Sequence, residues 1–226
     1  VLAGESMGEL AAYCAAGALP LEPAALLTHR WAGALQSASD ALGLRMAVVE
    51  DLEEEQFQPI AAALEAHVVV SEAPRLFVAA LPAARLDELD REVARRGGRT
   101  LVSNNPCAAH EPRLAKSAEI WEEHARFLEA LPFTLPRIPI VSTLHPGEPL
   151  DSPGALRTNR ADTSFLRVRW DETLAGLPAL GVRHFVLFGP LSAGYALKRL
   201  RALDPRLARV RVHVVGTLDP HPREPR

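Results

Sequence analysis

The sequence predicts an α/β protein in which a mainly parallel sheet, covered by helices on both faces, carries an inserted ferredoxin-like unit. Two observations lead to this prediction. The chain opens with an apolar segment, the turn Gly-x-Ser-x-Gly at residues 4–8 and a helical pattern, which is the order strand, tight turn, helix. Residues 44–103 then follow the order β-α-β-β-α-β, which is typical of a ferredoxin-like unit.

The turn at residues 4–8 supplies the first functional candidate and favours an α/β-hydrolase-like parallel sheet for the larger part of the chain. Ser6 is expected on a strained elbow that lifts its hydroxyl clear of the sheet, where side chains at positions 4 and 8 would clash. The helix that follows points its first N–H groups back at the serine, so the backbone N–H of Met7 can stabilise an oxyanion. The alternative is a glycine-rich turn with a bystander serine.

The elements before residue 104 are predicted from apolar periodicity and from glycine and proline punctuation. Helices are expected at residues 7–18, 23–42, 51–66 and 82–96. Strands are expected at residues 44–50, 67–71, 75–81 and 99–103. Four strands and two helices lie between residues 44 and 103 and make up the inserted unit. We therefore expect residues 44–103 to form a small subdomain.

The remainder of the chain returns to strands that alternate with helices. Helices are expected at residues 112–130, 167–180 and 191–203, and strands at residues 138–142, 184–188 and 209–215. A polar surface loop is expected at residues 143–159 and a disordered tail at residues 219–226. Residues 1–43 and 104–226 are together expected to form the large catalytic subdomain.

Composition and charge exclude several classes of protein. The 226 residues are 48% apolar and 23% charged with a net charge of −3, which is ordinary for a globular protein and gives no bulk attraction to nucleic acid. No apolar stretch approaches the roughly 20 residues of a membrane span, and no secretory signal pattern is present. Cys14 and Cys107 make neither a disulfide framework nor a metal cluster, which suits a reducing cytoplasm. Because the chain begins without Met, inside a predicted strand, we expect it to be part of a longer protein.

A serine is a poor nucleophile at neutral pH unless a base lies within hydrogen-bond reach. Of the eight histidines, His110 is the best placed, because it lies in an irregular segment beside the small residues Ala108 and Ala109. The alternative is a loop histidine that caps the next helix. Cys107 is expected to be buried or to line a pocket, since no neighbouring cation would lower the pKa of its thiol. Arg30, on an otherwise apolar helix, is either a surface residue or a fork that holds an anionic group.

These motifs together resemble the acyltransferase family of fatty-acid and polyketide synthesis, which contains malonyl-CoA:acyl carrier protein transacylases and the acyltransferase domains of modular polyketide synthases. Residues 4–9 and 15–19 are similar to the family's nucleophile segment, and residues 107–110 resemble the tetrapeptide that ends in its catalytic histidine. Residues 131–142 and 184–190 resemble later segments of the family. A unit inserted between the serine and the histidine is also the family's architecture.

The resemblance implies a transfer in two steps through an acyl-serine. Ser6 would attack the thioester of an acyl-CoA with His110 as general base, and the phosphopantetheine thiol of an acyl carrier protein would then take the acyl group. Backbone carbonyls would orient the histidine, here at Thr163 or Ser164. Arg30 would grip the free carboxylate of a malonyl-type acyl group. The resemblance implies no cofactor or metal, and ketosynthase and other synthase domains as linked partners.

The sequence departs from the family's pattern around the acyl site. Glu5 stands where the family usually has histidine, which places a carboxyl group beside the nucleophile. The stretch from Gly17 to Arg30 is one residue shorter than usual, and the family's N-terminal Gly-Gln-Gly loop is absent. Residues 107–110 match neither the common malonyl form nor the common methylmalonyl form. We expect four residues to set the acyl specificity: Glu5, Cys107, Ala108 and Ala109.

Two other functions remain open on the sequence alone. An α/β-hydrolase such as a thioesterase also uses Gly-x-Ser-x-Gly, and Asp204 and His213 follow Ser6 in the required order. The second alternative is a catalytically impaired module that resembles an acyltransferase and is kept for structure or for docking a carrier protein.

Overall fold

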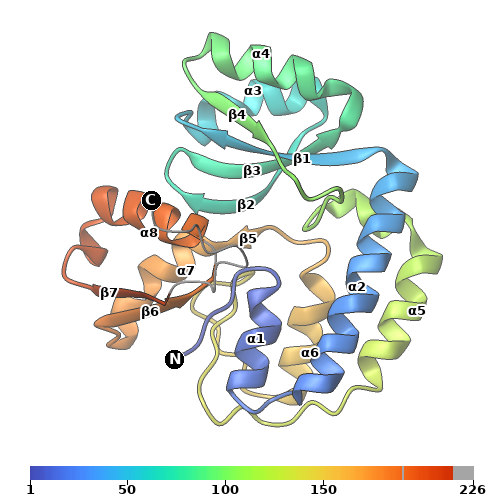
Figure 1. Cartoon of the computed structure of the whole chain (residues 1–226), viewed down its shortest axis with the longest axis vertical. Helices are drawn as coiled ribbons and strands as arrows, with labels where there is room; N and C mark the ends of the chain where they lie inside the picture. Colours follow the sequence, from blue (N-terminus) through green and yellow to red (C-terminus); the bar gives the residue numbers. More distant parts are fainter. Residues whose placement is uncertain (190, 216–226) are drawn as a thin grey trace, which may run out of the picture.

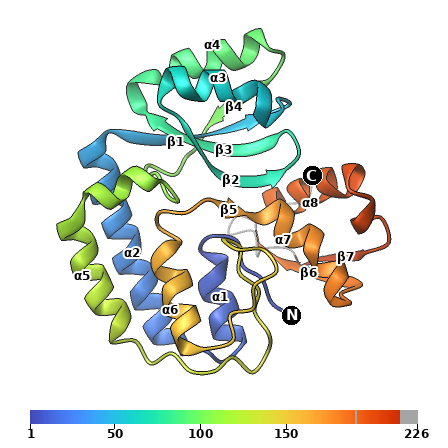
Figure 2. The same ribbon diagram turned by 180° about the vertical axis from the view of Figure 1, so that it is seen from behind.

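The computed structural model of the chain describes residues 1–189 and 191–215 and has a mixed α/β architecture. In Figure 1 the inserted unit lies above a layer of helices, and two short strands with their neighbouring helices lie to one side. Figure 2 shows the helical layer from behind. The layer consists of α1 (Gly8–Ala15), α2 (Leu21–Leu42), α5 (Ala118–Glu129) and α6 (Pro153–Asp162).

The inserted unit contains the strands and helices that the sequence predicts. Its strands are β1 (Leu44–Glu50), β2 (His67–Ala73), β3 (Leu76–Pro82) and β4 (Arg99–Val102). Its helices are α3 (Glu54–Leu64) and α4 (Leu86–Arg95), the latter entered through a 3-10 turn (Ala83–Arg85). The strands pair antiparallel in the order β4-β1-β3-β2. The predicted β-α-β-β-α-β order is therefore confirmed, whereas the division of the chain into two subdomains stays a prediction.

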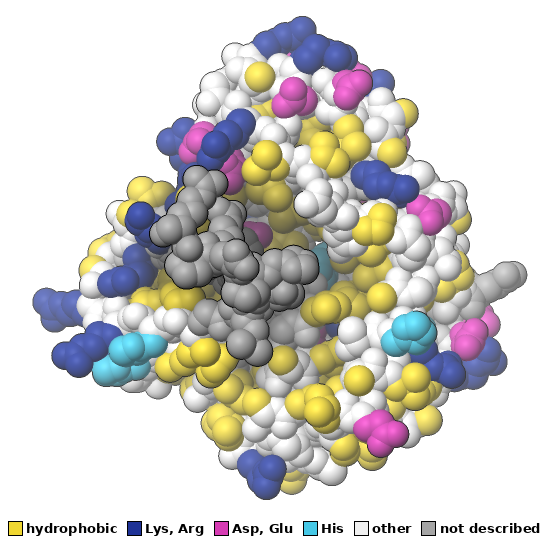
Figure 3. Space-filling model, in the orientation of Figure 1, with side chains coloured by type: hydrophobic (Ala, Val, Ile, Leu, Met, Phe, Trp, Pro, Cys, Tyr) yellow, Lys and Arg dark blue, Asp and Glu magenta, His cyan; other side chains and the backbone are white. Residues whose placement is uncertain are grey.

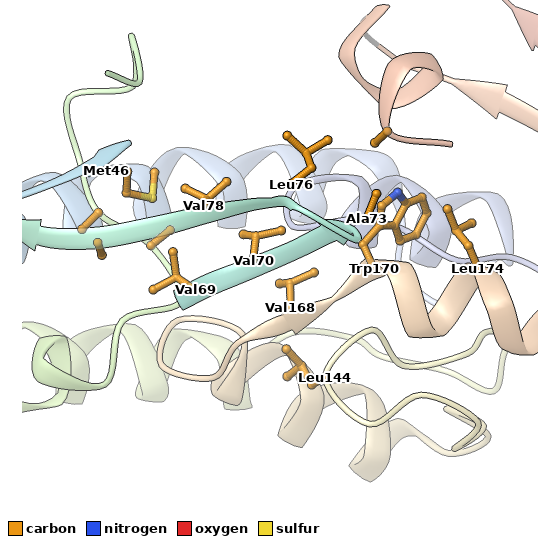
Figure 4. Close-up of a cluster of buried hydrophobic side chains, with 14 of the residues drawn as sticks. Met46, Val69, Val70, Ala73, Leu76, Val78, Leu144, Val168, Trp170 and Leu174 are labelled. Atoms are coloured by element: carbon orange, nitrogen blue, oxygen red, sulfur yellow. The ribbon is translucent and has the colours of Figure 1, made fainter. Parts of the chain in front are cut away.

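Both faces of this sheet are covered along β1, β2 and β3, which is why these strands have nearly continuous apolar sequences, whereas β4 is largely exposed. Ala47 and Val49 of β1 pack with Phe57 of α3 in one buried cluster. Met46 and Val78 point to the other face, into a second cluster shared with the rest of the chain. Figure 4 shows this second cluster, with side chains from the sheet on one side and from the larger part on the other. The unit is thus fixed to the larger part by an apolar layer.

A fifth strand extends the sheet and replaces the start of a predicted helix. The sequence predicts a helix over residues 167–180, but β5 (Val168–Arg169) pairs parallel with β2 before α7 (Trp170–Gly176) and a 3-10 turn (Leu177–Leu180) begin. Val168 is fully buried against the sheet. The extended conformation brings this β-branched side chain into the shared cluster, so tertiary packing overrides the local helical pattern.

Helix ends are predicted best where a glycine follows. The second helix is predicted to stop at Gly43, and α2 does so, with Gly43 in the left-handed conformation at φ +62°. α1 ends at Ala15, and Gly17 has φ +70°. A side chain at position 17 would also meet the guanidinium of Arg137 at 2.6 Å, but this flexible group can move, so it is the positive φ that favours glycine there.

The predicted helix over residues 112–130 is interrupted. A 3-10 helix (Pro112–Lys116) and α5 are separated by Ser117, whose backbone is not helical at φ −89° and ψ +55°. The buried indole N–H of Trp121 donates to the carbonyl of Leu114 at 2.8 Å. The same carbonyl accepts from the backbone N–H of Ser117 at 3.0 Å, which is the i+3 bond of a 3-10 turn in place of the i+4 bond of a continuous α-helix.

The predicted loop at residues 143–159 contains the start of α6, which the sequence analysis missed. Ser152 accepts a hydrogen bond from the backbone N–H of Ala155 at 3.1 Å, and Pro153 occupies the first turn. A serine cap followed by proline is a helix-start signal, and it was present in the sequence.

The predicted parallel sheet of the larger part is present only in fragments among the described residues. β6 (His184–Phe188) and β7 (Arg211–Val215) form a parallel pair next to α8 (Leu191–Leu203) and a 3-10 turn (Pro205–Leu207). The predicted strands at the N-terminus and at residues 138–142 reduce to a parallel bridge between Leu2 and Ile140. Pro139 accepts from Leu2 but has no N–H to donate, which limits the ladder. The predicted tail at residues 219–226 lies outside the described residues.

Across the part of the chain that the structure describes, none of the helices is both long and apolar enough to traverse a bilayer.

Candidate active site

The turn before α1 holds Ser6 in the conformation that the sequence predicts. Ser6 has a left-handed backbone at φ +52°, a conformation that is energetically costly for residues other than glycine. Gly4 is required, because a Cβ there would overlap the backbone of Gly8. Position 8 differs from the prediction, since a Cβ on Gly8 would meet no described atom within 4 Å. In Figure 1 this turn lies at the end of α1 that faces the inserted unit.

The structure brings Ser6 and His110 together across 104 residues of sequence. The Oγ of Ser6 lies 2.8 Å from Nε2 of His110, and Nδ1 of His110 lies 2.5 Å from the backbone carbonyl of Thr163. Because a carbonyl can only accept, Nδ1 carries the proton and Nε2 is left to accept from the serine. Thr163 is thus at the position predicted for a histidine-orienting carbonyl, and Ser164 is its neighbour in sequence.

The environment of His110 favours the neutral imidazole. The side chain is buried, and burial together with the positive charge of Arg160 lowers the pKa of His110 to about 4, although the Thr163 carbonyl opposes this. At neutral pH the imidazole is therefore uncharged, with its one proton on Nδ1. In that state it can act as a general base towards Ser6.

The loop that carries His110 is held by side chains from other elements. The hydroxyl of Ser39 on α2 accepts from the backbone N–H of Ala108 at 2.9 Å and donates to the Ala108 carbonyl at 3.1 Å. The backbone N–H of Glu111 donates to the carbonyl of Ser164 at 3.2 Å. His110 itself has a left-handed backbone at φ +60°, so these bonds hold a strained position.

The three residues before His110 lie in the core. Cys107, Ala108 and Ala109 are buried in the cluster that also contains Trp31 and Leu35 of α2. Burial raises the pKa of the Cys107 thiol, which keeps it protonated at neutral pH. Their small side chains let the loop approach the helix closely, while the role predicted for them in acyl specificity stays a prediction.

Trp31, rather than Arg30, is the α2 side chain next to His110. The ring centroids of Trp31 and His110 are 6.4 Å apart, and the indole N–H donates to the hydroxyl of Ser164 at 2.8 Å. Arg30, one residue earlier, points about 100° away from Trp31 around the helix axis. Its guanidinium lies 3.4 Å from Glu123 and over the ring of Phe127, both on α5.

This position of Arg30 differs from the expectation that it holds the substrate's carboxylate. The side chain is 44% exposed, and that of its partner Glu123 is 74% exposed, so the pair is open to solvent. The buried apolar residues of α2 follow the helical spacing of one face: Ala24, Leu27, Trp31, Leu35 and Ala38. Arg30 lies off that face, so the apolar periodicity could have located Trp31 as the inward residue.

Glu5 brings a carboxyl group close to the nucleophile, as the sequence predicts, but the acid is largely neutral at neutral pH. Burial and the nearby Glu72 of β2 raise the pKa of Glu5 to about 8. The pKa of Glu72 is raised as well, by burial and by the charge of Glu50. The inserted unit therefore contributes acidic side chains to the surroundings of Ser6. The face drawn in Figure 3 is hollowed between this unit and the helices below it.

The residues of the alternative hydrolase triad are not assembled with Ser6. Asp204 caps a 3-10 turn and pairs with Arg206, which lowers the pKa of its carboxyl. His213 of β7 stacks on His184 of β6 with ring centroids 6.3 Å apart. The histidine within hydrogen-bond distance of Ser6 is His110.

The sequence analysis missed a buried polar cluster behind the serine and histidine. It consists of five residues from α1 and the α6 region: Glu9, Tyr13, Asn159, Arg160 and Thr163. The signal was present, because Glu9 follows Ser6 by three residues and shares a helix face with Tyr13 at the i, i+4 spacing. A charged residue on an inward face indicates a partner elsewhere in the fold.

Residues 1–165, which are more than half of the chain, match the family model of the acyl transferase domain. The chain therefore belongs to the acyltransferase domain family. No curated protein is similar enough in sequence to count as a match.

Solved structures of malonyl-transfer proteins have a similar fold. The malonyl CoA-acyl carrier protein transacylase of Coxiella burnetii is 18% identical with a TM-score of 0.80, over 94% of this chain and 66% of that one. MCAT from Mycobacterium tuberculosis is 23% identical with a TM-score of 0.82, over 95% and 68%. The malonyl-transacylase PlMCAT, solved with the type II polyketide synthase acyl-carrier protein AntF, is 20% identical with a TM-score of 0.81, over 95% and 68%. These likenesses show the fold, and the chain spans about two thirds of the length of these proteins.

Proposed function

We propose that this chain is an acyltransferase that moves an acyl group from coenzyme A to the phosphopantetheine thiol of an acyl carrier protein, through an acyl-serine at Ser6. The observation that carries the proposal is the chain of contacts from Ser6 Oγ to His110 Nε2 at 2.8 Å and from His110 Nδ1 to the Thr163 carbonyl at 2.5 Å. This is the arrangement of a serine activated by an oriented base.

In the first half-reaction Ser6 Oγ attacks the thioester carbonyl while His110 Nε2 accepts the hydroxyl proton. The backbone N–H of Met7, at the start of α1, stabilises the oxyanion. When the tetrahedral intermediate collapses, the carbon–sulfur bond breaks and the coenzyme A thiolate takes the proton from His110. The serine ester remains, and the histidine is neutral again.

In the second half-reaction the carrier's phosphopantetheine thiol gives its proton to His110 and attacks the acyl-serine. The carbon–oxygen bond of the ester breaks, and Ser6 regains the proton from His110. The carbonyl of Thr163 holds the protonated imidazole in place in both steps, since it accepts from Nδ1 throughout. The proposed reaction needs no metal or other cofactor.

The acyl group that we propose is of the malonyl type. Support comes from the solved neighbours, whose names state malonyl transfer, and not from Arg30, which pairs with Glu123. An acyl carrier protein is the proposed partner, because PlMCAT is solved with one. Linked ketosynthase and other synthase domains are also proposed partners. We also propose a cytoplasmic location, because the free cysteines Cys14 and Cys107 are typical of a reducing compartment.

Intact-protein mass spectrometry tests the proposal. The protein is incubated with acetyl-, malonyl- and methylmalonyl-CoA, and Ser6→Ala, His110→Ala and Ser37→Ala are run beside it. Ser37 is an exposed serine of α2, so Ser37→Ala is a matched control that should acylate normally. We expect one acyl adduct that is absent in Ser6→Ala and strongly slowed in His110→Ala, with malonyl as the preferred group.

Other outcomes would favour the alternatives. An adduct that water removes quickly in the absence of a carrier protein would indicate a thioesterase. If no thioester gives an adduct although Ser6 and His110 are intact, the chain would be an acyltransferase-like module without catalytic activity.

A further inference from the structure

A buried carboxylate connects the helix that follows Ser6 with the segment that orients His110. Glu9 lies on α1, three residues after Ser6, and its side chain is buried. Its Oε2 accepts from the hydroxyl of Thr163 at 2.7 Å, and its Oε1 accepts from the amide of Asn159 at 2.5 Å. The hydroxyl of Tyr13 donates to the same Oε1.

Thr163 contacts His110 through its backbone carbonyl and Glu9 through its hydroxyl. Its backbone carbonyl accepts from His110 Nδ1, and its hydroxyl contacts Glu9 and also the Asn159 carbonyl at 2.8 Å. The hydroxyl has a single proton, and a carboxylate attracts it more strongly than a neutral carbonyl does. The bond to Glu9 therefore fixes Thr163 at the end of α6, where the helix gives no further support to its carbonyl.

Glu9 also faces a buried positive charge. Arg160 on α6 is fully buried, with Nη1 3.7 Å from Oε2 of Glu9 and its guanidinium 4.1 Å from the ring centroid of Trp31. Among the described residues none accepts a hydrogen bond from the guanidinium nitrogens. A buried cation with so few partners depends on the nearby carboxylate and the indole face for compensation.

We propose that Glu9 is a positioning residue for the acyl transfer: it acts through Thr163 to hold the carbonyl against His110 Nδ1, and it offsets the charge of Arg160. One carboxylate then connects α1, the helix that follows Ser6, with Thr163, whose carbonyl orients His110. The effect on catalysis rests on the proposed function, whereas the effect on the imidazole does not.

Several charged groups surround His110 and must be considered in any titration. Arg160 of α6 and Glu9 of α1 lie behind it. His124 of α5 is also close to Arg160, and burial and that charge lower its pKa to about 4. Glu111, the next residue in the loop, is paired with Arg113 and His67.

The test compares Glu9→Gln and Thr163→Val with the matched control Tyr13→Phe. Glu9→Gln keeps the shape and removes the charge, and Thr163→Val removes the hydroxyl but keeps the backbone carbonyl. Tyr13→Phe removes a different bond to the same carboxylate and leaves the Oε2 contact with Thr163 intact. The first readout is the rate of Ser6 acylation at saturating thioester, and the second is the tautomer and titration of His110 by ¹⁵N NMR.

We expect Glu9→Gln and Thr163→Val to acylate about 10- to 100-fold more slowly at unchanged KM, the equivalent of one charge-assisted hydrogen bond. Their His110 signals should show a mixture of the two neutral tautomers, and His110 should titrate at a lower pH in Glu9→Gln, where Arg160 loses its counter-charge. Tyr13→Phe should keep the wild-type tautomer and a rate within about twofold of wild type.

The proposal fails if both variants keep the wild-type tautomer and rate while Ser6→Ala is inactive, or if Tyr13→Phe is as impaired as they are. Should Glu9→Gln not fold, Thr163→Val decides between these results. If the wild-type protein forms no acyl adduct, the proposed function fails instead, and the NMR comparison still decides whether Glu9 orients His110.

Discussion

Ser6 and His110 both have left-handed backbones, but different parts of the molecule impose them. The turn at Ser6 is built from its immediate neighbours. The N–H groups of Gly8 and Glu9 donate to the carbonyls of Glu5 and Ser6, at 2.8 and 3.1 Å, within the same turn. The position of Ser6 therefore depends on a few consecutive residues.

The loop at His110 is held by residues far away in the sequence. Ser39 of α2 bonds both polar groups of the Ala108 backbone, and the Thr163 and Ser164 carbonyls accept from His110 and the Glu111 N–H. The comparison teaches that the nucleophile's geometry is encoded locally, whereas the base is positioned by tertiary contacts. Substitutions should therefore act on the two regions in different ways.

The largest effect is expected from Gly4→Ala, which breaks the local turn. The added Cβ would overlap the Gly8 backbone, and we expect a loss of about 3 kcal/mol in the free energy of unfolding together with loss of Ser6 acylation. Gly8→Ala is the control, because open space surrounds that position and alanine favours a helix start more than glycine does. Urea unfolding of both variants measures the difference, and equal destabilisation would contradict a local origin of the turn.

Ser39→Ala should break the histidine loop without touching the serine turn. It leaves the buried N–H and carbonyl of Ala108 without their hydroxyl partner, which costs about 2 kcal/mol of stability and slows acylation. The exposed Ser37 on the same helix provides the control Ser37→Ala. If Ser39→Ala acylates at the wild-type rate, the loop does not need this tether.

Arg160→Met should change the pH dependence of acylation. The acylation rate depends on neutral His110 and falls as the pH drops through its pKa, which Arg160 helps to lower to about 4. Without that charge the pKa of His110 rises towards its ordinary value, so the acid limb of the pH–rate profile should move to higher pH by about one unit. Glu9 keeps three hydrogen bonds, so the fold should persist. An unchanged acid limb would exclude a role for Arg160 in tuning the base.

Glu5→Gln should change the alkaline limb instead. The carboxyl of Glu5 is neutral below its pKa of about 8, and its ionisation above that pH places a negative charge beside Ser6 and the oxyanion. We expect wild-type acylation to slow as the pH rises through about 8 and Glu5→Gln to lose this decline. A decline that persists in Glu5→Gln would have another cause.

Arg30→Ala should have the smallest effect. Its ion pair with Glu123 is exposed, and such pairs contribute less than about 1 kcal/mol. The preference between acetyl- and malonyl-CoA should therefore not change. If malonyl acylation alone is lost, Arg30 does reach the acyl carboxylate, as the family resemblance implies.

The same contrast between local and distant contacts explains how much of the fold the sequence predicts. The inserted unit is predicted well, because each of its elements carries a clear apolar pattern of its own, and Pro74, Pro82 and the Gly97-Gly98 pair mark three of the element ends. The larger part is predicted less well. β5 is set by the burial of Val168 against β2, and the Trp121 indole donates to the Leu114 carbonyl across the break at Ser117. The local sequence pattern predicts neither the pairing of β5 with β2 nor the bond of the Trp121 indole.

The site follows the same rule. Ser6, His110 and the pair Thr163 or Ser164 are predicted from a turn motif and a family resemblance, and the structure brings Ser6, His110 and the Thr163 carbonyl together. Arg30 lies one residue, or about 100° around α2, from the inward-facing Trp31, and its predicted contact with the acyl carboxylate stays a prediction. The inward face of α1 indicated that Glu9 has a partner, but the identity of that partner could not be predicted, because the α6 residues lie about 150 residues further along the chain.

The most direct test of the account is transfer from the isolated acyl-protein to a carrier. The acylated chain is freed of acyl-CoA and mixed with an acyl carrier protein that bears phosphopantetheine, and the masses of both proteins are followed. We predict that the acyl mass leaves Ser6 and appears on the carrier in equal amount, and that it does so only slowly in His110→Ala. If the acyl group is released as free acid while the carrier stays unmodified, the chain is not an acyl carrier protein transacylase.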